Sequence, residues 1–265
     1  MVATKMNFVS PYALETPSIF YPGRGKTQVY NESYAHFDVV VEDFYKSGQA
    51  ASIDLQGFQV EEAPTKLRDF NDPSAITSVY YDEVIALVKK VTGATEAFVF
   101  DHTIRRGQPS IAHKPAQHVH NDYTHTSAPV RAAERLGEET MQRLAGKRMV
   151  QVNVWRSING VVRQLPLAFM DARSLELDDL VRTEIRYSDS GHVGEIYGVR
   201  HRPTQRWYFF PEMTGDQVAL IKGFDSKTDG VARFTPHTAF ELQENDPQAP
   251  PRESIEVRTF AFIDA

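Results

Sequence analysis

The sequence predicts a mostly β fold with flanking helices, of the double-stranded β-helix or jelly-roll type. One strong helical pattern precedes a long run of short strand patterns, and turn signals such as DSG, RPTQ and KTDG separate those strands. Helices followed by many short strands are typical of a sandwich or jelly roll. The chain shows neither a βαβ order nor a glycine-rich phosphate loop, so a Rossmann fold does not fit.

Residues 71–95 carry the helical pattern and are expected to flank the strands. Lys89 and Lys90 suit the last turn of this helix, and Gly93 suits the position directly after it. Apolar side chains recur at helical spacing, at Val84, Ile85, Leu87, Val88 and Val91.

The first seventy residues are rich in tyrosine, phenylalanine and proline and are only weakly periodic. We expect them to form extended segments that cover the core. Within them, YAHFDVVVEDF (34–44) predicts a strand region.

Residues 96–265 are expected to form the jelly-roll core, and the whole chain, 1–265, to form a single domain. EAFVFDH (96–102) predicts a short buried strand, and 128–145 predicts an exposed helix that breaks near Gly137. From residue 148 the period changes to two, with Val150, Val152 and Val154 alternating with Gln151, Asn153 and Trp155. Further strands are expected in TEIRYS, EIYGVRH, QRWYFFPEM, DQVALIKGFDS and ESIEVRTFAFI.

The composition excludes several classes of site and partner. The 265 residues include no cysteine, which rules out disulfides, thiolate nucleophiles and cysteine-bound metals. A net charge of -6 without a basic segment argues against nucleic acid and anionic membranes as partners. No apolar run is long enough for a transmembrane helix, and the N-terminus lacks a signal-peptide pattern. We expect a cytoplasmic enzyme that acts on a small molecule, and the composition leaves its oligomeric state open.

The stretch QHVHNDYTH (117–125) holds three of the nine histidines beside an aspartate. Alternate residues of a strand share a face, which would place His118, His120 and Asp122 together. His120 and Asp122 completed by a distant histidine would form the facial triad of non-haem Fe(II) oxygenases. All three side chains together would suit a zinc hydrolase of the metallo-β-lactamase type, although Tyr123 stands where a histidine is expected. A polar strand end without a metal is the third interpretation.

The C-terminal third contains residues that complete the first of these interpretations. His237 stands at an expected strand end, and Arg252 and Ser254 alternate on the final strand. Arginine pairs with a carboxylate through two hydrogen bonds, and a serine hydroxyl can add a third. A keto acid chelated to iron needs such an anchor for its far carboxylate. The order His-x-Asp, distal His, Arg-x-Ser is therefore what an Fe(II)/2-oxoglutarate enzyme requires, although Arg252 could instead pair with Glu253 or Glu256 at the surface.

Several motifs together resemble the non-haem Fe(II)/2-oxoglutarate oxygenases of the CmcJ-like and AsaB-like hydroxylase/desaturase group, which includes relatives of gibberellin desaturase. They span residues 65–260 and read FVFDHTIRR, HVHND, VNVWRSI, WYFFPEM, IKGFDS, ARFTPHTAF and APPRESIEVR.

The resemblance implies a double-stranded β-helix, with His120, Asp122 and His237 as iron ligands and Arg252 and Ser254 as the 2-oxoglutarate anchor. It also implies Fe(II), 2-oxoglutarate and O₂ as the requirements of the reaction. The expected chemistry is oxidation of an unactivated C–H bond of a small natural-product or amino-acid-like substrate, by hydroxylation, desaturation or oxidative cyclisation. A zinc-dependent hydrolase is the alternative.

Residues around these motifs are candidates for further contacts. Asn153 could donate to the keto acid or be a satisfied core amide, because a buried amide must be paired. His118 shares the ligand face but would overfill a triad, so we expect it to hydrogen-bond beside the site. The family is rich in glutamine and serine after His-x-Asp, where this chain has Tyr123-Thr124-His125, so the substrate class does not carry over. The candidate substrate contacts are Tyr123, Thr124, His125, Arg106 and Arg156, with Asp171 as an alternative partner of Arg156 and a solvated surface pair as the alternative for Arg105 and Arg106.

Overall fold

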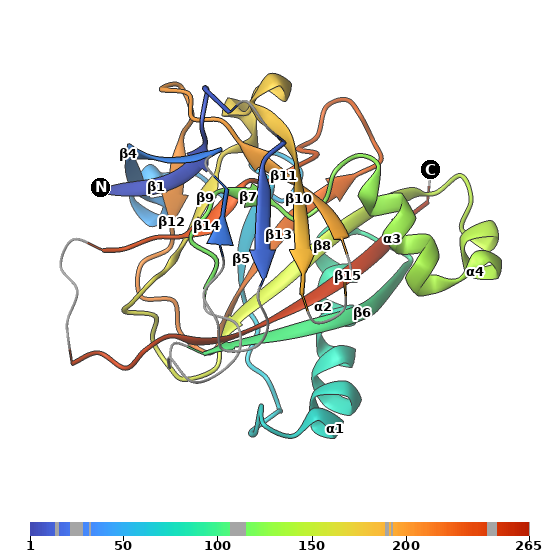
Figure 1. Ribbon diagram of the computed structural model, residues 1–265. Helices are drawn as coiled ribbons and strands as arrows, with labels where there is room; N and C mark the ends of the chain where they lie inside the picture. Colours follow the sequence, from blue (N-terminus) through green and yellow to red (C-terminus); the bar gives the residue numbers. More distant parts are fainter. Residues whose placement is uncertain are drawn as a thin grey trace.

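Two β-sheets face each other and enclose the centre of the molecule (Figure 1). The computed structural model describes residues 1–13, 16–21, 29–31, 33–106, 115–188, 191, 193–242 and 248–264. Within these ranges the strands form one sheet of ten strands and one of five. This architecture confirms the predicted mostly β jelly roll with flanking helices.

The elements follow one another along the chain with most of the helices before residue 145. The strands are β1 (Val2–Val9), β2 (Ser18–Tyr21), β3 (Val29–Tyr30), β4 (Tyr34–Asp43), β5 (Phe58–Glu62), β6 (Glu96–Arg106), β7 (His120–Asn121), β8 (Arg148–Ser157), β9 (Leu167–Met170), β10 (Leu180–Tyr187), β11 (Val193–Val199), β12 (Trp207–Phe209), β13 (Gln217–Asp225), β14 (His237–Ala239) and β15 (Glu253–Ile263). The helices are α1 (Pro73–Ala75), α2 (Tyr81–Thr92), α3 (Ser127–Leu136) and α4 (Glu138–Arg143), with a π-helical turn η2 (Ile76–Tyr80) and short 3₁₀ turns η1 (Phe44–Ser47), η3 (Ala172–Ser174) and η4 (Leu177–Asp179).

The small sheet has the strand order β5-β13-β8-β15-β6, and its outer face packs on α2. The valines of β8 that the sequence placed on one face lie in this cluster, together with Ile255 and Val257 of β15. The helical face opposite them includes Val84 and Val88. The predicted helical flank is therefore confirmed. It continues without a break from α1 through η2 into α2 and ends at Gly93, which adopts the left-handed conformation.

The large sheet has the order β1-β4-β12-β9-β14-β7-β11-β10-β2-β3. Its β1 and β4, and β5 of the small sheet, come from the first seventy residues, for which the sequence predicted extended segments. These segments are thus integral strands of both sheets. The division of the chain into 1–70, 71–95 and 96–265 stays a prediction.

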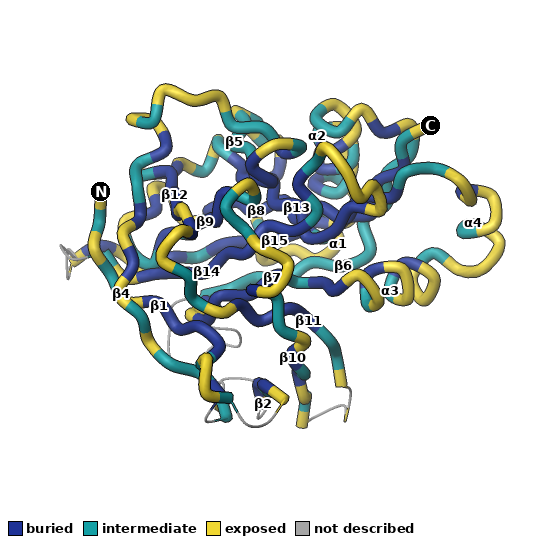
Figure 2. Tube along the Cα trace, turned by 90° about the horizontal axis from the view of Figure 1, so that it is seen from above, coloured by how far each residue is buried: buried dark blue, intermediate teal, exposed yellow. Residues whose placement is uncertain are grey.

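The inner faces of the two sheets meet in an aromatic core. Trp155 of β8 packs in one cluster with Phe169 of β9 and Tyr208 of β12, so the inner face of β8 points toward the large sheet. Buried residues follow the strands of both sheets, whereas exposed residues gather on α3, α4 and the loops (Figure 2). A strand buried on both faces explains why Gln151 and Asn153 are inside the protein although they alternate with valines.

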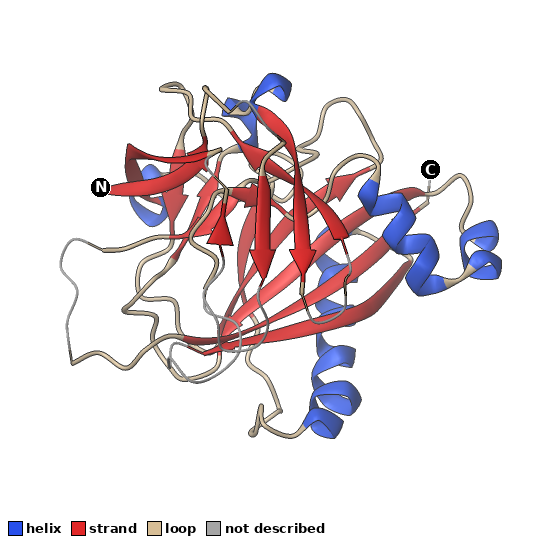
Figure 3. Cartoon of the chain, viewed as in Figure 1, coloured by secondary structure: helices blue, strands red, loops and turns tan. Residues whose placement is uncertain are grey.

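Two sequence-based expectations need adjustment. The strand expected over 96–102 continues to Arg106 and is half-buried along its length, so the prediction of a short buried strand was wrong. The predicted exposed helix is confirmed, and it breaks at Gly137 into α3 and α4. Both helices lie at the edge of the molecule, outside the strands (Figure 3). Among the described residues, none of the helices has the length and apolar character needed to cross a lipid bilayer.

Gly57 packs closely against Thr235, in the segment that leads into β14. Its φ is +87°, and a Cβ atom there would lie 2.1 Å from the Thr235 hydroxyl oxygen. We expect Gly57→Ala to lower the free energy of unfolding by about 2–4 kcal/mol, since it combines backbone strain with overpacking. The matched control is Gly48→Ala, where φ is +70° but no atom lies within 4 Å, and about 1 kcal/mol is expected. Urea unfolding measures both, and equal losses for the two variants would contradict this account of the contact.

Candidate metal centre

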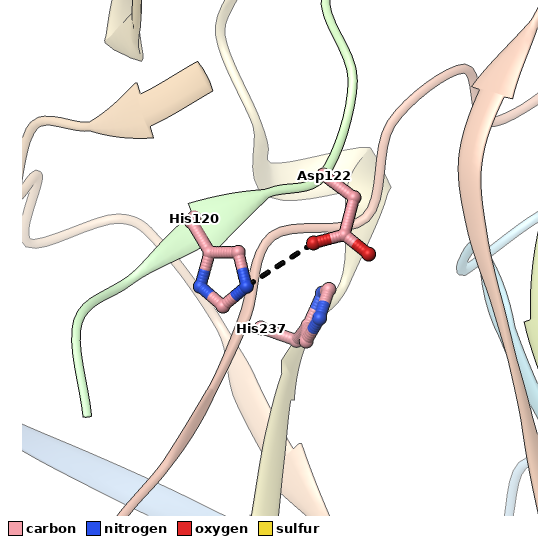
Figure 4. Close-up of side chains that lie close together, drawn as sticks. All are labelled: His120, Asp122 and His237. Atoms are coloured by element: carbon pink, nitrogen blue, oxygen red, sulfur yellow. Dashed lines mark ion pairs between the residues drawn. The ribbon is translucent and has the colours of Figure 1, made fainter. Parts of the chain in front are cut away.

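Two histidines meet across neighbouring strands of the large sheet. His120 of β7 and His237 of β14 are directly opposite each other in the antiparallel register, and their ring centroids are 4.6 Å apart. Asp122 follows β7 and brings its Oδ1 to 3.3 Å from the Nε2 of His120 (Figure 4). One ligand atom from each of the three side chains lies within 4.8 Å of the others. The structure therefore brings together the His-x-Asp pair and the distal histidine.

Backbone carbonyls fix the orientation of both imidazoles. The Nδ1–H of His120 donates to the His118 carbonyl at 2.8 Å, and that of His237 donates to the Thr235 carbonyl at 3.0 Å. In its neutral form each ring therefore carries its lone pair on Nε2, the tautomer that a metal ligand needs. Burial, together with the neighbouring His120, lowers the pKa of His237 and keeps that ring neutral.

Asp122 is held as a carboxylate in a half-buried place. Burial alone raises its pKa, but the hydrogen bond and charge of His120, the charge of His237 and the charge of Arg258 together move the pKa well below its usual value. The Oδ2 atom accepts a 2.5 Å hydrogen bond from the amide of Asn153 and lies 3.8 Å from the Nε of Arg258. Two imidazoles and one ionised carboxylate are a donor set that suits a divalent metal such as Fe(II).

His118 lies beside this group but outside it. Its Nδ1 is 3.2 Å from the hydroxyl of Tyr30, and its ring centroid is 4.4 Å from that of His120. Its Nε2 is buried without a partner among the described residues. The three side chains whose ligand atoms converge are His120, Asp122 and His237, and His118 is not one of them. The geometry therefore gives no support to a zinc site made of His118, His120 and Asp122.

Arg252 and Ser254 offer unsatisfied hydrogen-bond donors on the inner face of the small sheet. Arg252 is 4% exposed, its Cζ lies 5.3 Å from the centroid of the Trp155 ring, and its Nη1 donates to the carbonyl of Leu165. The Nε of Arg252 and the hydroxyl of Ser254 are buried with no partner in the described part of the chain. Burial and the charge of Arg105 lower the pKa of Arg252 to about 9. A lowered pKa is expected for a buried cation that has no adjacent anion.

These unpartnered groups fit the carboxylate of a keto acid. No carboxylate among the described residues forms an ion pair with Arg252, so an incoming anion would satisfy its guanidinium and the neighbouring hydroxyl. Glu256 lies on the same face of β15 as Ser254, and its negative charge raises the pKa of both His237 and Arg252. The anchor and the ligand group therefore belong to one region of the interior.

A cavity of about 800 Å³ opens beside Asp122. It is bounded by the inner face of β6, by α3 and by the strands β10 and β11, and Tyr123 is one of its lining residues. Arg105, which the sequence analysis named together with Arg106, also lines it, whereas the sequence did not point to most of the other walls. They include Tyr21, Thr103, Val130, Ile185, Tyr187 and Arg258.

Four of the five expected substrate contacts, Arg156 among them, do not line this cavity. Thr124 caps the start of α3, where its hydroxyl accepts from the Ser127 amide at 2.9 Å and donates to Glu195 at 2.5 Å. His125 is exposed and its Nδ1 lies 2.7 Å from the hydroxyl of Tyr197. Arg106 binds Asn71 and lies 3.4 Å from Glu253.

Arg156 differs most from its expected role. Its side chain is buried on the outer side of β8, where it donates to the hydroxyl of Tyr80 at 3.0 Å and to the carbonyls of Ala63 and Gly215. The alternative partner Asp171 instead pairs with Arg173 and Arg206. The structure therefore supports neither the substrate contact nor the ion pair with Asp171, and Arg156 serves packing against the helical flank.

Comparisons with known proteins agree on one class of enzyme. Residues 6–262 match the family described as an oxidoreductase/YMDC permease-like domain. The hydroxylase/desaturase efuI of Hormonema carpetanum is 32% identical, over 84% of this chain and 83% of its own. The Fe(II)/2-oxoglutarate-dependent dioxygenase nvfI of Aspergillus novofumigatus is 30% identical over 98% of this chain and 96% of its own. A structure of the iron and alpha-ketoglutarate-dependent endoperoxidase NvfI superimposes with a TM-score of 0.88, at 28% identity, over 99% of this chain and 98% of that chain.

Two buried histidines make the stability of the metal-free protein depend on pH. Burial holds the pKa of His118 well below its usual value of 6.5 and also lowers the pKa of His237. Below pH 6.5 the unfolded chain binds protons that the folded protein excludes, so stability is lost as the pH falls. We expect the free energy of unfolding to decrease between pH 7.5 and 5.5, by at most about 1.4 kcal/mol per pH unit for each histidine.

Urea unfolding of the metal-free protein at several pH values measures this slope. His118→Phe should reduce the slope because it removes the histidine whose pKa burial lowers most strongly. A free energy of unfolding that is constant over this range would show that the two rings are not held neutral.

Proposed function

Because this chain belongs to the Fe(II)/2-oxoglutarate-dependent oxygenases of the hydroxylase/desaturase group, we propose that His120, Asp122 and His237 bind its iron. The enzyme requires Fe(II), 2-oxoglutarate and O₂, as the relatives named for this chemistry do. The observation that carries the assignment is the convergence of two oriented imidazoles and one carboxylate within 4.8 Å. A facial set of three ligands leaves the remaining coordination positions open.

Arg252 and Ser254 are proposed to bind the far carboxylate of 2-oxoglutarate. Their unpartnered donor atoms support this role, and Trp155 and the Leu165 carbonyl hold the guanidinium in place. Asn153 was a further candidate for contact with the keto acid. Its amide is engaged with Asp122 and Gln151, so a direct contact is not part of the proposal.

With iron bound, O₂ would be the oxidant: 2-oxoglutarate would supply two of the four electrons that reduce it, leaving as succinate and carbon dioxide, and the substrate C–H bond would supply the other two. The chain contributes binding and orientation. Asp122 lies at the cavity wall, so a substrate in the cavity presents its C–H bond beside the ligand group. The buried clusters around the site, including Tyr123 and Phe260, exclude water from that side.

The substrate is proposed to be an apolar natural product of drug-like size. A volume of about 800 Å³ is typical of such ligands and is too large for a free amino acid. Ile185, Val130, Tyr21 and Tyr187 offer apolar and aromatic surface. The guanidinium of Arg258 is already neutralised by Asp101 and Glu256, so it does not call for a charged substrate. The cytoplasmic location expected from the sequence stays a prediction.

We expect the native protein with Fe(II) and 2-oxoglutarate to show a weak visible charge-transfer band under anaerobic conditions. His237→Ala should abolish the band because it removes a proposed ligand. Arg252→Ala should weaken 2-oxoglutarate binding by about 10–100-fold, since a buried charge-assisted interaction is lost. The matched control is Arg143→Ala on α4, where the arginine is exposed and pairs with Glu96. A band that persists without His237 would contradict the triad.

Succinate release should be stimulated by apolar polycyclic compounds and not by free amino acids. Val130→Trp should reduce this stimulation several-fold, because Val130 lines the cavity, while leaving the slow substrate-free release of succinate intact. Val161→Trp is the control, at an exposed position that does not line the cavity. Stimulation by small amino acids that survives Val130→Trp would refute the proposed substrate class.

A further inference from the structure

The two oxygens of Asp122 face different surroundings. Oδ1 is 3.3 Å from the Nε2 of His120, on the side of the proposed metal. Oδ2 accepts the 2.5 Å hydrogen bond from the amide of Asn153 and has the Nε of Arg258 at 3.8 Å. Oδ1 therefore faces the other proposed ligands, whereas Oδ2 is held by side chains of the small sheet.

The hydrogen bonds behind Oδ2 have a fixed direction. An ionised carboxylate only accepts, so Asn153 must present its NH₂ group to Asp122. Its carbonyl oxygen then points the other way, where the Nε2 of Gln151 donates to it at 2.6 Å. Gln151 and Asn153 alternate on the inner face of β8 and are both 0% exposed. Water therefore does not compete for these two bonds.

A glycine on the neighbouring strand makes room for Gln151. The pairing of β13 with β8 is irregular between Lys222 and Phe224, and Gly223 lies at this irregularity. A Cβ atom at Gly223 would lie 2.0 Å from the Oε1 of Gln151. Any larger residue would displace the Gln151 side chain, and with it the partner of Asn153.

We propose that Gln151, Asn153 and Gly223 form a carboxylate clamp that keeps Oδ2 of Asp122 away from the metal and presents Oδ1 alone. Asp122 then binds through one oxygen, and the coordination position that its second oxygen would occupy stays available to the cosubstrate. The three residues of the clamp are positioning residues, since none of them touches the metal. The inference rests on the proposed function, because it takes Asp122 as an iron ligand.

Binding of Co(II) in the absence of 2-oxoglutarate tests the clamp. Asn153→Ala should weaken Co(II) binding by about 10–100-fold, the usual effect of removing a hydrogen-bond partner from a metal ligand. Gln151→Leu should weaken binding in the same direction by a smaller factor. Both variants should also change the visible spectrum of bound Co(II), because Oδ2 becomes free to coordinate.

Gln205→Leu is the matched control. Gln205 is a buried amide whose Nε2 donates to the carboxylate of Asp179 at 3.2 Å and to the carbonyl of Arg200 at 2.8 Å, and neither partner is a proposed ligand. The Gln205→Leu substitution removes an amide–carboxylate hydrogen bond of the same kind and should leave the affinity and visible spectrum of bound Co(II) unchanged. Urea unfolding of all variants shows whether each one is folded.

Gly223→Ala provides a second test that leaves both amides in the chain. It should reproduce the effect of Gln151→Leu, and it decides the question if Asn153→Ala does not fold. The clamp is overturned if Asn153→Ala binds Co(II) like the native protein and weakens only 2-oxoglutarate, which would make Asn153 a direct contact of the cosubstrate. It is also overturned if Gln151→Leu and Gly223→Ala both leave Co(II) binding unchanged. Absence of succinate release from the native protein would instead refute the proposed function.

Discussion

The site depends on the antiparallel pairing of β7 with β14. This pairing sets His120 opposite His237, although the two residues are far apart in the sequence. Both strands are very short, and they are fixed by their neighbours β9 and β11 in the large sheet. A shift by one residue would turn one of the two rings to the other face of the sheet. The ligand geometry is therefore a property of the whole sheet and not of the two short strands.

Because residues alternate along its strands, the small sheet has an outer face that packs on a helix and an inner face that carries most of its polar side chains. The outward residues of β8 and β15 are mainly aliphatic and pack the sheet on α2, with Arg156 as an exception, whereas the inward residues include amides, a serine and arginines. Because both faces are buried, each inward polar group needs a partner or a ligand. Most of them have a partner in the protein. Arg252 Nε, Ser254 Oγ and Gln151 Oε1 do not, and the first two are the hydrogen-bond donors that an incoming carboxylate would satisfy.

Short motifs were enough to predict the fold class, the helical flank and the three side chains that converge. These motifs were informative because alternation along a strand determines which side chains share a face of the sheet. The cavity walls could not be predicted in the same way, since they come from β2, β6, α3 and β10, which are separated in the sequence. Ending the strand at residue 102 also hid the alternation of Asp101, Thr103 and Arg105 on the inner face of β6. Arg258 was missed because a lone arginine in a strand is usually read as a surface residue.

Leu165 connects a loop to Arg252, the proposed anchor of 2-oxoglutarate. Its backbone is held at φ 47°, in the left-handed region that leucine disfavours, and its carbonyl accepts from Arg252. The connection between β8 and β9 thus fixes where the guanidinium stands, at a distance from the sheet residues that carry the chemistry. Lengthening or shortening that connection would move the proposed anchor relative to the proposed iron ligands, so selectivity for the chain length of the keto acid could evolve by loop changes while both sheets stay intact.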